Sequence, residues 1–299
     1  MNALEIRPAQ IDLHIHTTIS DGTDTPAELL GKVRAAGIRL FAITDHDAVR
    51  GCEEMIRLLA EQGEAETGEK ALRFLTGVEF SCKDLKGSYH ILGYGYDPDA
   101  EPVRRLAAEA HEVRLRKLQG RLDRLRSRRG IEFAPEEVAA LQALSNPGKP
   151  HIANLLVRRG YAATREEAIA MIGDLPEMRN LSFRPEQAVE AILQSGGIPV
   201  LAHPSYGNGS QHIYGTALAE RVGRLTEMGL RGLEAYYSEF TPDLIRENLA
   251  LADRFGLYVT AGSDYHGTNK KIPLGKTHLA EVPELPAGLQ RFLKDVTER

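Results

Sequence analysis

The chain has 299 residues, of which 42% are hydrophobic and 26% are charged, and this composition lies in the middle of the globular range. It excludes a chain that is disordered, collagen-like or coiled coil throughout, and the length favours one large domain or one domain with an insertion. With 37 basic and 42 acidic residues the formal net charge is −5, so the chain lacks the overall basic surface that binds a DNA duplex or an anionic membrane.

The cysteines and the apolar segments bear on the compartment. Only Cys52 and Cys82 are present, which excludes a disulfide framework and suits a reducing environment. No apolar stretch approaches the roughly 20 residues of a membrane-spanning helix. Residues 1–10 lack the hydrophobic core of a signal peptide. We therefore expect a cytoplasmic protein.

The N-terminal third alternates strands with helices. Hydrophobicity of period two predicts a strand over 9–16, and Thr25-Pro26 opens a helix that Gly37 ends. The remaining patterns predict strands at 39–44, 72–78 and 88–93, with a helix at 49–62.

The C-terminal part repeats the same alternation. Apolar patterns predict strands at 198–202, 231–236 and 257–262. Helical periodicity appears at 185–195, 217–228, 242–255 and 287–296. Such alternation buries parallel strands beneath helices, as in an α/β barrel or a doubly wound sheet.

Residues 100–184 interrupt this alternation. A long, strongly basic helix is predicted over 101–130, and shorter helical patterns follow without a convincing strand, at 135–143, 150–159 and 164–172. We interpret 100–184 as a helical insertion that forms a substrate-recognition lid on a body made of 1–99 and 185–299. The basic residues of the long helix form either an ordinary solvated surface or a face that receives a polyanion.

A cluster of polar side chains marks the first predicted strand. His14 and His16 are two residues apart, so they leave the same face of the strand, which Asp12 shares. Burying such groups unpaired costs about 2–7 kcal/mol each, so they need partners or a metal ion. Taken alone, the motif is equally compatible with two surface histidines on an edge strand.

Imidazoles and carboxylates also accompany the other predicted strands. They are His46, Glu79, His90, His203, Asp264 and His266. Singly, each is typical of a helix cap or a satisfied core residue. Together they converge if the six strands meet at their carboxyl ends, as in a parallel barrel or sheet. Nitrogen and oxygen ligands without cysteine suit zinc, manganese or iron, and so many ligands exceed the roughly four to six that one ion takes.

Six ordered motifs resemble those of the polymerase and histidinol phosphatase (PHP) family of phosphoesterases. They are Asp12-x-His14-x-His16, Thr44-Asp45-His46-Asp47, Gly77-Val78-Glu79, His90-Ile91-Leu92-Gly93, Ala202-His203-Pro204 and Gly262-Ser263-Asp264-x-His266. The insertion, chiefly around 148–153 and 185–191, resembles that of a bacterial subgroup. This subgroup contains nucleoside 3′,5′-bisphosphate phosphatases and an enzyme that trims RNA from its 5′ end. The resemblance implies a distorted (β/α)7 barrel with an inserted helical subdomain.

The resemblance also implies two or three divalent ions of manganese, zinc or iron. The first ion would be held by His14, His16, Glu79 and Asp264. Glu79 would bridge to a second ion, which His90 and His203 complete. A third ion would be held by Asp21, His46 and His266. A metal-bound hydroxide would then be the nucleophile, because a bound metal lowers the pKa of water from ~15.7 to about 7.

The activity implied by the resemblance is hydrolysis of a phosphomonoester of a small phosphorylated metabolite, with a nucleoside 3′,5′-bisphosphate favoured. Cationic and aromatic side chains would contact the substrate, and the candidates are Lys149, His151, Arg158, Arg179, Arg184 and Tyr206. The alternatives are a 5′-to-3′ exoribonuclease on short RNA, a phosphatase for histidinol phosphate, and a catalytically silent metal-binding regulatory module.

Overall fold

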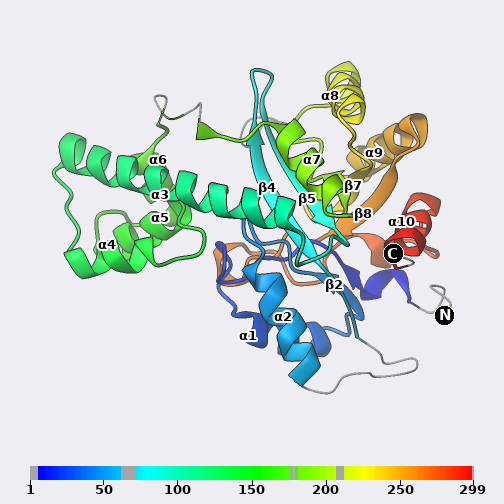
Figure 1. The fold of residues 1–299 in the computed structure, drawn as a ribbon, viewed down its shortest axis with the longest axis horizontal. Helices are drawn as coiled ribbons and strands as arrows, with labels where there is room; N and C mark the ends of the chain where they lie inside the picture. Colours follow the sequence, from blue (N-terminus) through cyan, green and yellow to red (C-terminus); the bar gives the residue numbers. More distant parts are fainter. Residues whose placement is uncertain (1–5, 62–71, 176–177, 179–180, 207–211, 298–299) are drawn as a thin grey trace.

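The computed structural model describes residues 6–61, 72–175, 178, 181–206 and 212–297. Two β-sheets flanked by helices form the body, and a helical arm projects from one side of it (Figure 1). Within the described residues the helices follow one another in the predicted order.

The smaller sheet is parallel and has the strand order β1-β2-β3. Its strands are β1 (Ile11–Asp12), β2 (Leu40–Ala42) and β3 (Arg73–Leu75), and the connecting helices are α1 (Pro26–Ala35) and α2 (Arg50–Glu61). Thr25 caps α1, because its hydroxyl accepts from the Glu28 N–H while the Glu28 carboxylate accepts from the Thr25 N–H. The predicted helix start is therefore confirmed.

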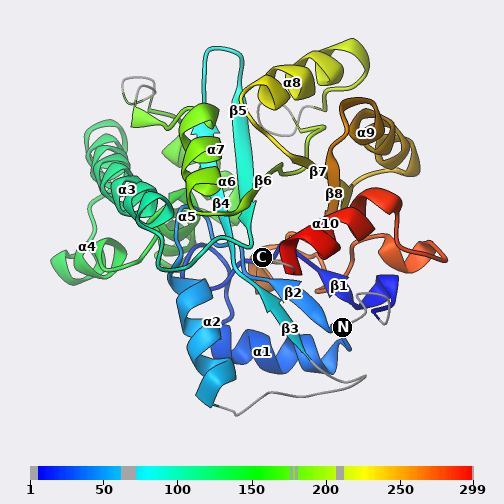
Figure 2. The same ribbon diagram turned by 45° about the vertical axis from the view of Figure 1, so that its right-hand side comes forward.

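The larger sheet is mixed and has the order β4-β5-β6-β7-β8. Its strands are β4 (Gly77–Lys83), β5 (Ser88–Tyr94), β6 (Ile198–Leu201), β7 (Gly232–Tyr237) and β8 (Tyr258–Gly262). Strand β5 is antiparallel to both β4 and β6, whereas β6, β7 and β8 are parallel. The helices around this sheet are α7 (Pro185–Gln194), α8 (Gly215–Glu227), α9 (Pro242–Phe255) and α10 (Ala287–Thr297) (Figure 2).

The strand predicted over 9–16 is wrong in its extent, because β1 ends at Asp12 and both His14 and His16 follow it. The predicted strand 72–78 is wrong in its extent as well. It divides into β3 and β4, which belong to different sheets. The chain crosses at Gly77, where a Cβ atom would lie only 2.4 Å from the Ile43 carbonyl oxygen, so a side chain would block this approach. Because β4 runs to Lys83, Glu79 lies inside a strand, and His90 lies inside the antiparallel β5. The expectation that Glu79 follows the end of a parallel strand is therefore wrong. His90 lies inside a strand as predicted, but that strand is antiparallel to its neighbours.

The two sheets meet without forming one closed sheet in the described residues. Isolated bridges join Ile15 to Tyr265 and His46 to Glu79. The fold is thus α/β with one parallel and one mixed sheet, and the closed (β/α)7 barrel stays a prediction.

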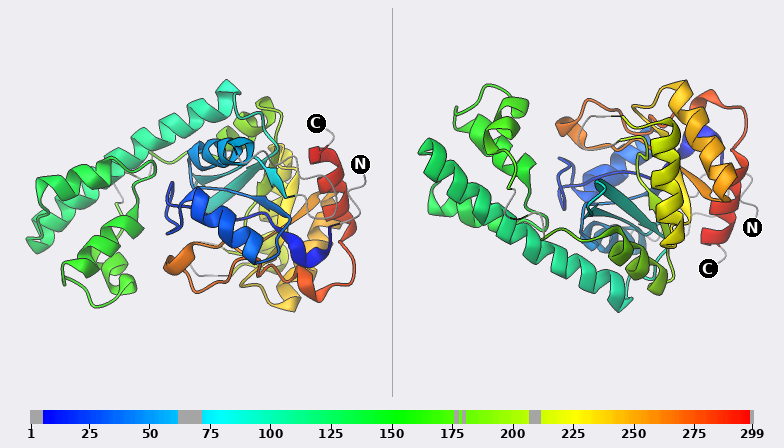
Figure 3. Two further views of the ribbon diagram at one scale, coloured as in Figure 1. Left: turned by 90° about the horizontal axis from the view of Figure 1, so that it is seen from below. Right: turned by 90° about the horizontal axis from the view of Figure 1, so that it is seen from above.

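The arm consists of four helices and has an apolar cluster of its own. The helices are α3 (Glu101–Arg129), α4 (Pro135–Gln142), α5 (Lys149–Arg158) and α6 (Arg165–Ile172) (Figure 3). The cluster includes Leu118 and Leu122 of α3 and Leu156 of α5, whereas Val103, at the start of α3, packs in the body core. Residues 101–172 contain no strand, as expected. The limits 100 and 184 of the insertion stay a prediction.

Candidate metal centre

Four ligand atoms meet in the interior beside β4. His14 Nε2 lies 3.1 Å from His16 Nε2, and each of these nitrogens is 3.2 Å from Glu79 Oε2. Asp264 Oδ1 lies 3.5 Å from His14 Nε2 and 3.2 Å from His16 Nε2. A tetrahedral ion with bonds of about 2.0–2.1 Å separates its ligands by about 3.3 Å, and the His14, His16 and Glu79 atoms have this spacing. Asp264 lies near the two histidine nitrogens of this group.

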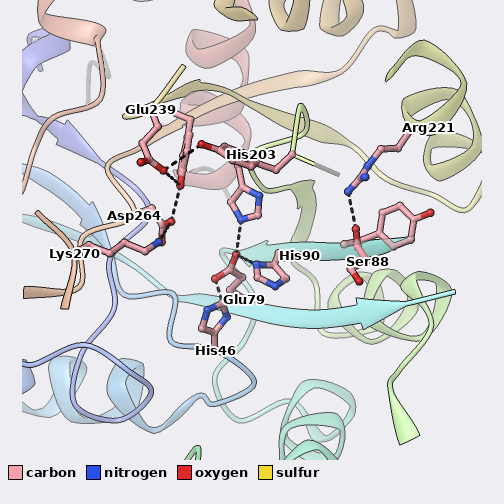
Figure 4. A pocket seen from close by; sticks show the side chains of 12 residues that line it. His46, Glu79, Ser88, His90, His203, Arg221, Glu239, Asp264 and Lys270 are labelled. Atoms are coloured by element: carbon pink, nitrogen blue, oxygen red, sulfur yellow. Dashed lines mark hydrogen bonds and ion pairs between the residues drawn. The ribbon is translucent and has the colours of Figure 1, made fainter. Parts of the chain in front are cut away.

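The two carboxylate oxygens of Glu79 face further imidazoles. Oε1 is 2.9 Å from His90 Nδ1 and 3.4 Å from His203 Nε2, and Oε2 is 2.9 Å from His46 Nδ1 (Figure 4). Within the described part of the chain, these Glu79 oxygens and the His46 and His90 nitrogens are buried without a hydrogen bond of suitable geometry. Buried polar atoms normally have such partners, so their lone pairs fit a metal ion.

A third group lies on the other side of His16. His266 Nε2 is 3.1 Å from Asp21 Oδ1, which is itself buried without a hydrogen bond among the described residues. His16, Asp21, His46 and His266 offer ligand atoms that all lie within 4.8 Å of one another. All nine side chains predicted as ligands therefore come together in one cluster. The position of His46 differs from the prediction in one respect, because His46 lies close to Glu79 as well as to Asp21 and His266.

The β4–β5 hairpin explains how Glu79 and His90 meet. Ser81 pairs with His90 in the antiparallel register, and Glu79 lies two residues from Ser81 on the same face. The two ligand side chains are thus diagonal neighbours on one sheet surface.

Strained backbone lies next to the cluster. Asp47, His203 and Asp264 are non-glycine residues with positive φ angles of 52°, 29° and 57°. Such conformations cost about 1–3 kcal/mol each and persist where surrounding contacts hold them, commonly at functional sites.

Buried carboxylates orient the cluster from behind. Glu234 accepts from His14 Nδ1 and from the His203 N–H, both at 2.8 Å. Asp45 accepts from the N–H and hydroxyl of Thr17 and from the Ser20 hydroxyl, each at 2.7 Å. The Ser20 hydroxyl in turn lies 3.3 Å from His16 Nδ1, so Asp45 reaches the cluster through Ser20. Hydrogen bonds to a ligand side chain fix its orientation and raise its basicity.

Burial and neighbouring charges set the protonation of the cluster. Burial raises the pKa of Glu79, but His46, His14 and His90 outweigh it and hold that pKa well below the ordinary value. Burial, His266 and His46 lower the pKa of His16 to about 4. Burial lowers the pKa of His14, but Glu234, Glu79 and Asp264 outweigh it and raise that pKa well above the ordinary value. In the same way Glu79 and Asp21 outweigh burial and raise the pKa of His46 to about 9. A bound metal ion would displace these protons, because a ligand imidazole is neutral.

A cavity of about 360 Å³ opens over the cluster. It is lined by Glu79, His90, His203 and Asp264 at the cluster and by Tyr206 and Tyr237 beside it (Figure 4). The volume lies within the range of small-molecule sites.

The predicted substrate residues are dispersed. Tyr206 lines the cavity, and its hydroxyl is 3.3 Å from Glu239 Oε2. His151, on the arm, lies against the backbone of Ser20, next to Asp21, and burial lowers its pKa. Lys149 Nζ pairs with Asp174 at 2.6 Å.

The remaining candidates lie away from the cavity or cannot be placed. Arg158 is exposed and 4.0 Å from Glu137, and Arg184 is exposed at the start of α7. Arg179 lies outside the described residues. The structure thus brings Tyr206 to the cavity and leaves the roles of all six residues as predictions.

The sequence did not single out several residues of this region. Lys270 contacts Asp264 Oδ2, and its place shortly after the Gly262-to-His266 motif is the only sequence signal for it. Glu234 and Arg221 lie in an apolar strand and an amphipathic helix, where no pattern distinguishes them.

Comparison with known proteins places these residues in a family context. The family model described as "PHP domain" matches residues 12–192. The chain is 32% identical to the 3′,5′-nucleoside bisphosphate phosphatase of Chromobacterium violaceum, over 93% of each chain. It is 30% identical to the phosphoribosyl 1,2-cyclic phosphate 1,2-diphosphodiesterase of Eggerthella lenta, over 88% of this chain and 96% of that protein.

Two further matches are similar in extent. A 5′-3′ exoribonuclease of Haemophilus influenzae is 28% identical over 89% of this chain and 93% of that protein. The solved structure of a protein assigned as a metal-dependent phosphoesterase from Bifidobacterium adolescentis has a TM-score of 0.77 at 30% identity, and the match covers 91% of this chain and 93% of that protein.

None of the described helices combines the length and apolar character needed to cross a bilayer.

Proposed function

This chain belongs to the PHP domain family and is a metal-dependent phosphoesterase; from this premise we propose that its substrate is a nucleoside 3′,5′-bisphosphate. The observation that carries the proposal is the cavity over Glu79, which joins a cluster of metal-ligand side chains to a space large enough for a nucleotide. The 32% identity to a phosphatase of that specificity supports the same choice.

We further propose that the cluster holds two or three divalent ions. His14, His16, Glu79 and Asp264 would hold the first ion. The ligand atoms of the first three lie within 4.8 Å of one another, and Asp264 Oδ1 lies 3.2 Å from His16 Nε2. Glu79, His90 and His203 would hold the second, and Asp21, His46 and His266 the third. His46 is also positioned to join the second site. Such ligands suit manganese, zinc or iron.

Side chains around the cluster hold the candidate ligands in the orientation needed for phosphate-ester hydrolysis. When bound, the ions activate water and polarise the phosphoryl group. Glu234 holds His14 by its Nδ1 and keeps Nε2 turned toward Glu79. The Tyr237 hydroxyl donates to Asp264 Oδ2 at 2.8 Å, and Lys270 contacts the same oxygen. These contacts keep the Asp264 carboxylate ionised and fixed in place.

Hydrolysis of short RNA from its 5′ end is the second candidate. It is favoured by three cationic residues that we call the inner face of α3, namely Arg114, Lys117 and Arg121. These residues follow one another at helical spacing and are partly buried. Burial together with Arg114 and Arg121 lowers the pKa of Lys117 to about 8, and burial together with Arg114 lowers that of Arg121 to about 10. Asp47 pairs with Arg114. An RNA backbone would add the further negative charge that offsets Lys117 and Arg121. No comparable observation favours histidinol phosphate, and membership of a phosphoesterase family argues against a catalytically silent module.

The test is phosphate release from adenosine 3′,5′-bisphosphate by purified protein reloaded with manganese. We expect turnover by the wild type and none by a variant in which His14 and His16 are both alanine. Equal turnover by both proteins rejects the metal-centre assignment. If a short RNA is trimmed while adenosine 3′,5′-bisphosphate stays intact, the exoribonuclease replaces the nucleotide phosphatase.

A further inference from the structure

Two cationic side chains line the cavity over the metal centre among the described residues, Lys270 and Arg221. They differ in their partners. Lys270 contacts the Asp264 carboxylate, whereas no carboxylate of the described residues lies within ion-pair distance of Arg221.

Arg221 is nevertheless held firmly. Its carbon Cζ lies 4.4 Å from the centre of the Tyr89 ring, and Nη2 donates to the Ser88 carbonyl oxygen at 2.8 Å (Figure 4). Its Nε is buried without a hydrogen-bond partner in the described structure. The guanidinium is therefore oriented in advance while it keeps donor capacity and an unneutralised charge, which are the features that bind an anion.

Arg224, one turn further along α8, is an arginine with a carboxylate partner and serves as the comparison for Arg221. It also stacks on Tyr89, at 5.3 Å, but its Nη1 is 2.8 Å from Asp84 Oδ2. Burial lowers the pKa of Arg224, but Tyr89 and Asp84 more than offset this and raise it above the ordinary value. For Arg221 burial prevails and lowers the pKa to about 10. Only Arg221 of the two lines the cavity.

The spacing along β5 connects Arg221 to the metal centre. Ser88, whose carbonyl accepts from Arg221, lies two residues before His90 on the same strand. Two residues of a strand span about 6.6–6.8 Å. Because Arg221 and His90 line the same cavity, a ligand with one phosphate at His90 would place a second phosphate at Arg221 through a short linker such as a ribose.

We propose that Arg221 anchors the phosphate that is not hydrolysed, in a substrate carrying two phosphates on one ribose. This inference rests on the proposed function and names the residue that would distinguish a bisphosphate from a monophosphate. The guanidinium fork contacts two phosphate oxygens at once, which an ammonium group cannot do.

The test compares Arg221→Gln and Arg221→Lys with the wild type on two substrates, adenosine 3′,5′-bisphosphate and p-nitrophenyl phosphate, which has one phosphate and no ribose. For the bisphosphate we expect kcat/KM to fall about 10- to 100-fold in Arg221→Gln and less in Arg221→Lys. For p-nitrophenyl phosphate we expect both variants to stay within about twofold, with unchanged metal content. Arg224→Lys is the matched control and should leave the ratio of the two kcat/KM values unchanged. An equal loss on both substrates, or no loss on the bisphosphate, overturns the subsite.

A second measurement separates this proposal from the proposed function. Adenosine 3′,5′-bisphosphate is added as an inhibitor of p-nitrophenyl phosphate hydrolysis. If the wild type binds the bisphosphate without hydrolysing it, the proposed reaction fails, yet an inhibition constant that rises at least about tenfold in Arg221→Gln still supports the subsite. An inhibition constant that is the same in wild type and variant, or no inhibition of either, overturns it.

Discussion

His14 and Glu234 lie 2.8 Å apart, Nδ1 to Oε1, although 220 residues separate them in the sequence. Both side chains are fully buried, and the other Glu234 oxygen accepts from the His203 backbone. One carboxylate thus fixes a histidine from the N-terminal part and the backbone of another from the C-terminal part. With a metal ion bound, the Nδ1 contact would select the tautomer of His14 whose Nε2 lone pair faces the ion.

Replacing Glu234 with glutamine is expected to weaken the metal centre while keeping its shape. The amide retains the volume but not the negative charge that strengthens His14 as a ligand. We expect metal affinity and kcat/KM for the phosphomonoester to fall about 10- to 100-fold, measured by metal content after dialysis and by phosphate release. Glu190→Gln on the exposed face of α7 is the control and should behave as the wild type. If Glu234→Gln keeps full metal content and activity, the orienting role is wrong.

The order of elements was predictable because helix and strand patterns are local in the sequence, whereas the candidate ligand set was inferred from the resemblance of six motifs to those of the PHP family. The His14-x-His16 pair shows itself by period-two spacing, and the capping residues of α1 mark its start. The position of Glu79 within a strand and the antiparallel direction of the strand that carries His90 were not predictable in this way. The crossing at Gly77 and the antiparallel β4–β5 pairing depend on contacts between distant segments, which a single-strand pattern does not encode.

The substrate residues were the least predictable part. Lys149 and Arg158 look like phosphate ligands in the sequence, but Asp174 and Glu137 are their neighbours in the fold. Glu234 lies in a strand that is buried on both faces, so its sequence shows no alternation that would set it apart. A helix-surface arginine such as Arg221 differs from its neighbours only through the tertiary contacts around it.

Removing the metal is expected to destabilise the folded chain. An ion that binds only the folded state adds about 2.7 kcal/mol when its free concentration is 100 times its Kd, and the clustered ligands exist only after folding. We therefore expect a chelator to lower the Tm and manganese to restore it in a thermal unfolding scan. The variant with alanine at His14 and His16 should show a smaller change. A Tm that is identical with and without chelator contradicts this prediction.

Gly262 allows β8 to pass directly behind the metal centre. A Cβ atom at this position would lie 2.1 Å from His14 Cβ and 2.5 Å from Glu234 Oε1. Gly262→Ala is therefore expected to displace His14, reducing both the bound metal and the Tm. Gly31→Ala is the matched control, because nothing lies within 4 Å of the added methyl group in the middle of α1. It should stabilise the protein by about 0.5–1 kcal/mol. Normal metal content in Gly262→Ala would show that the contact is not essential.

The lowered pKa of Lys117 predicts how RNA binding depends on pH. Burial, Arg114 and Arg121 lower its pKa to about 8. The ammonium is charged below that pH and attracts the RNA backbone, and the attraction is lost as the pH rises through about 8. We expect the affinity for a short RNA, measured by fluorescence anisotropy on the uncleaving variant with alanine at His14 and His16, to fall about three- to tenfold between pH 7 and pH 9.

Two further substitutions test whether Lys117 is the group whose loss of charge weakens RNA binding at high pH. In Lys117→Met the affinity should already be low at pH 7 and nearly independent of pH. In Lys117→Arg it should stay high at pH 9, because the guanidinium keeps its charge. Lys294→Met on α10 is the control and should keep the wild-type profile, because this lysine lies on a helix that packs against β8. Should Lys117→Met lose affinity with rising pH as the wild type does, the titrating group lies elsewhere and the inner face of α3 does not carry the RNA.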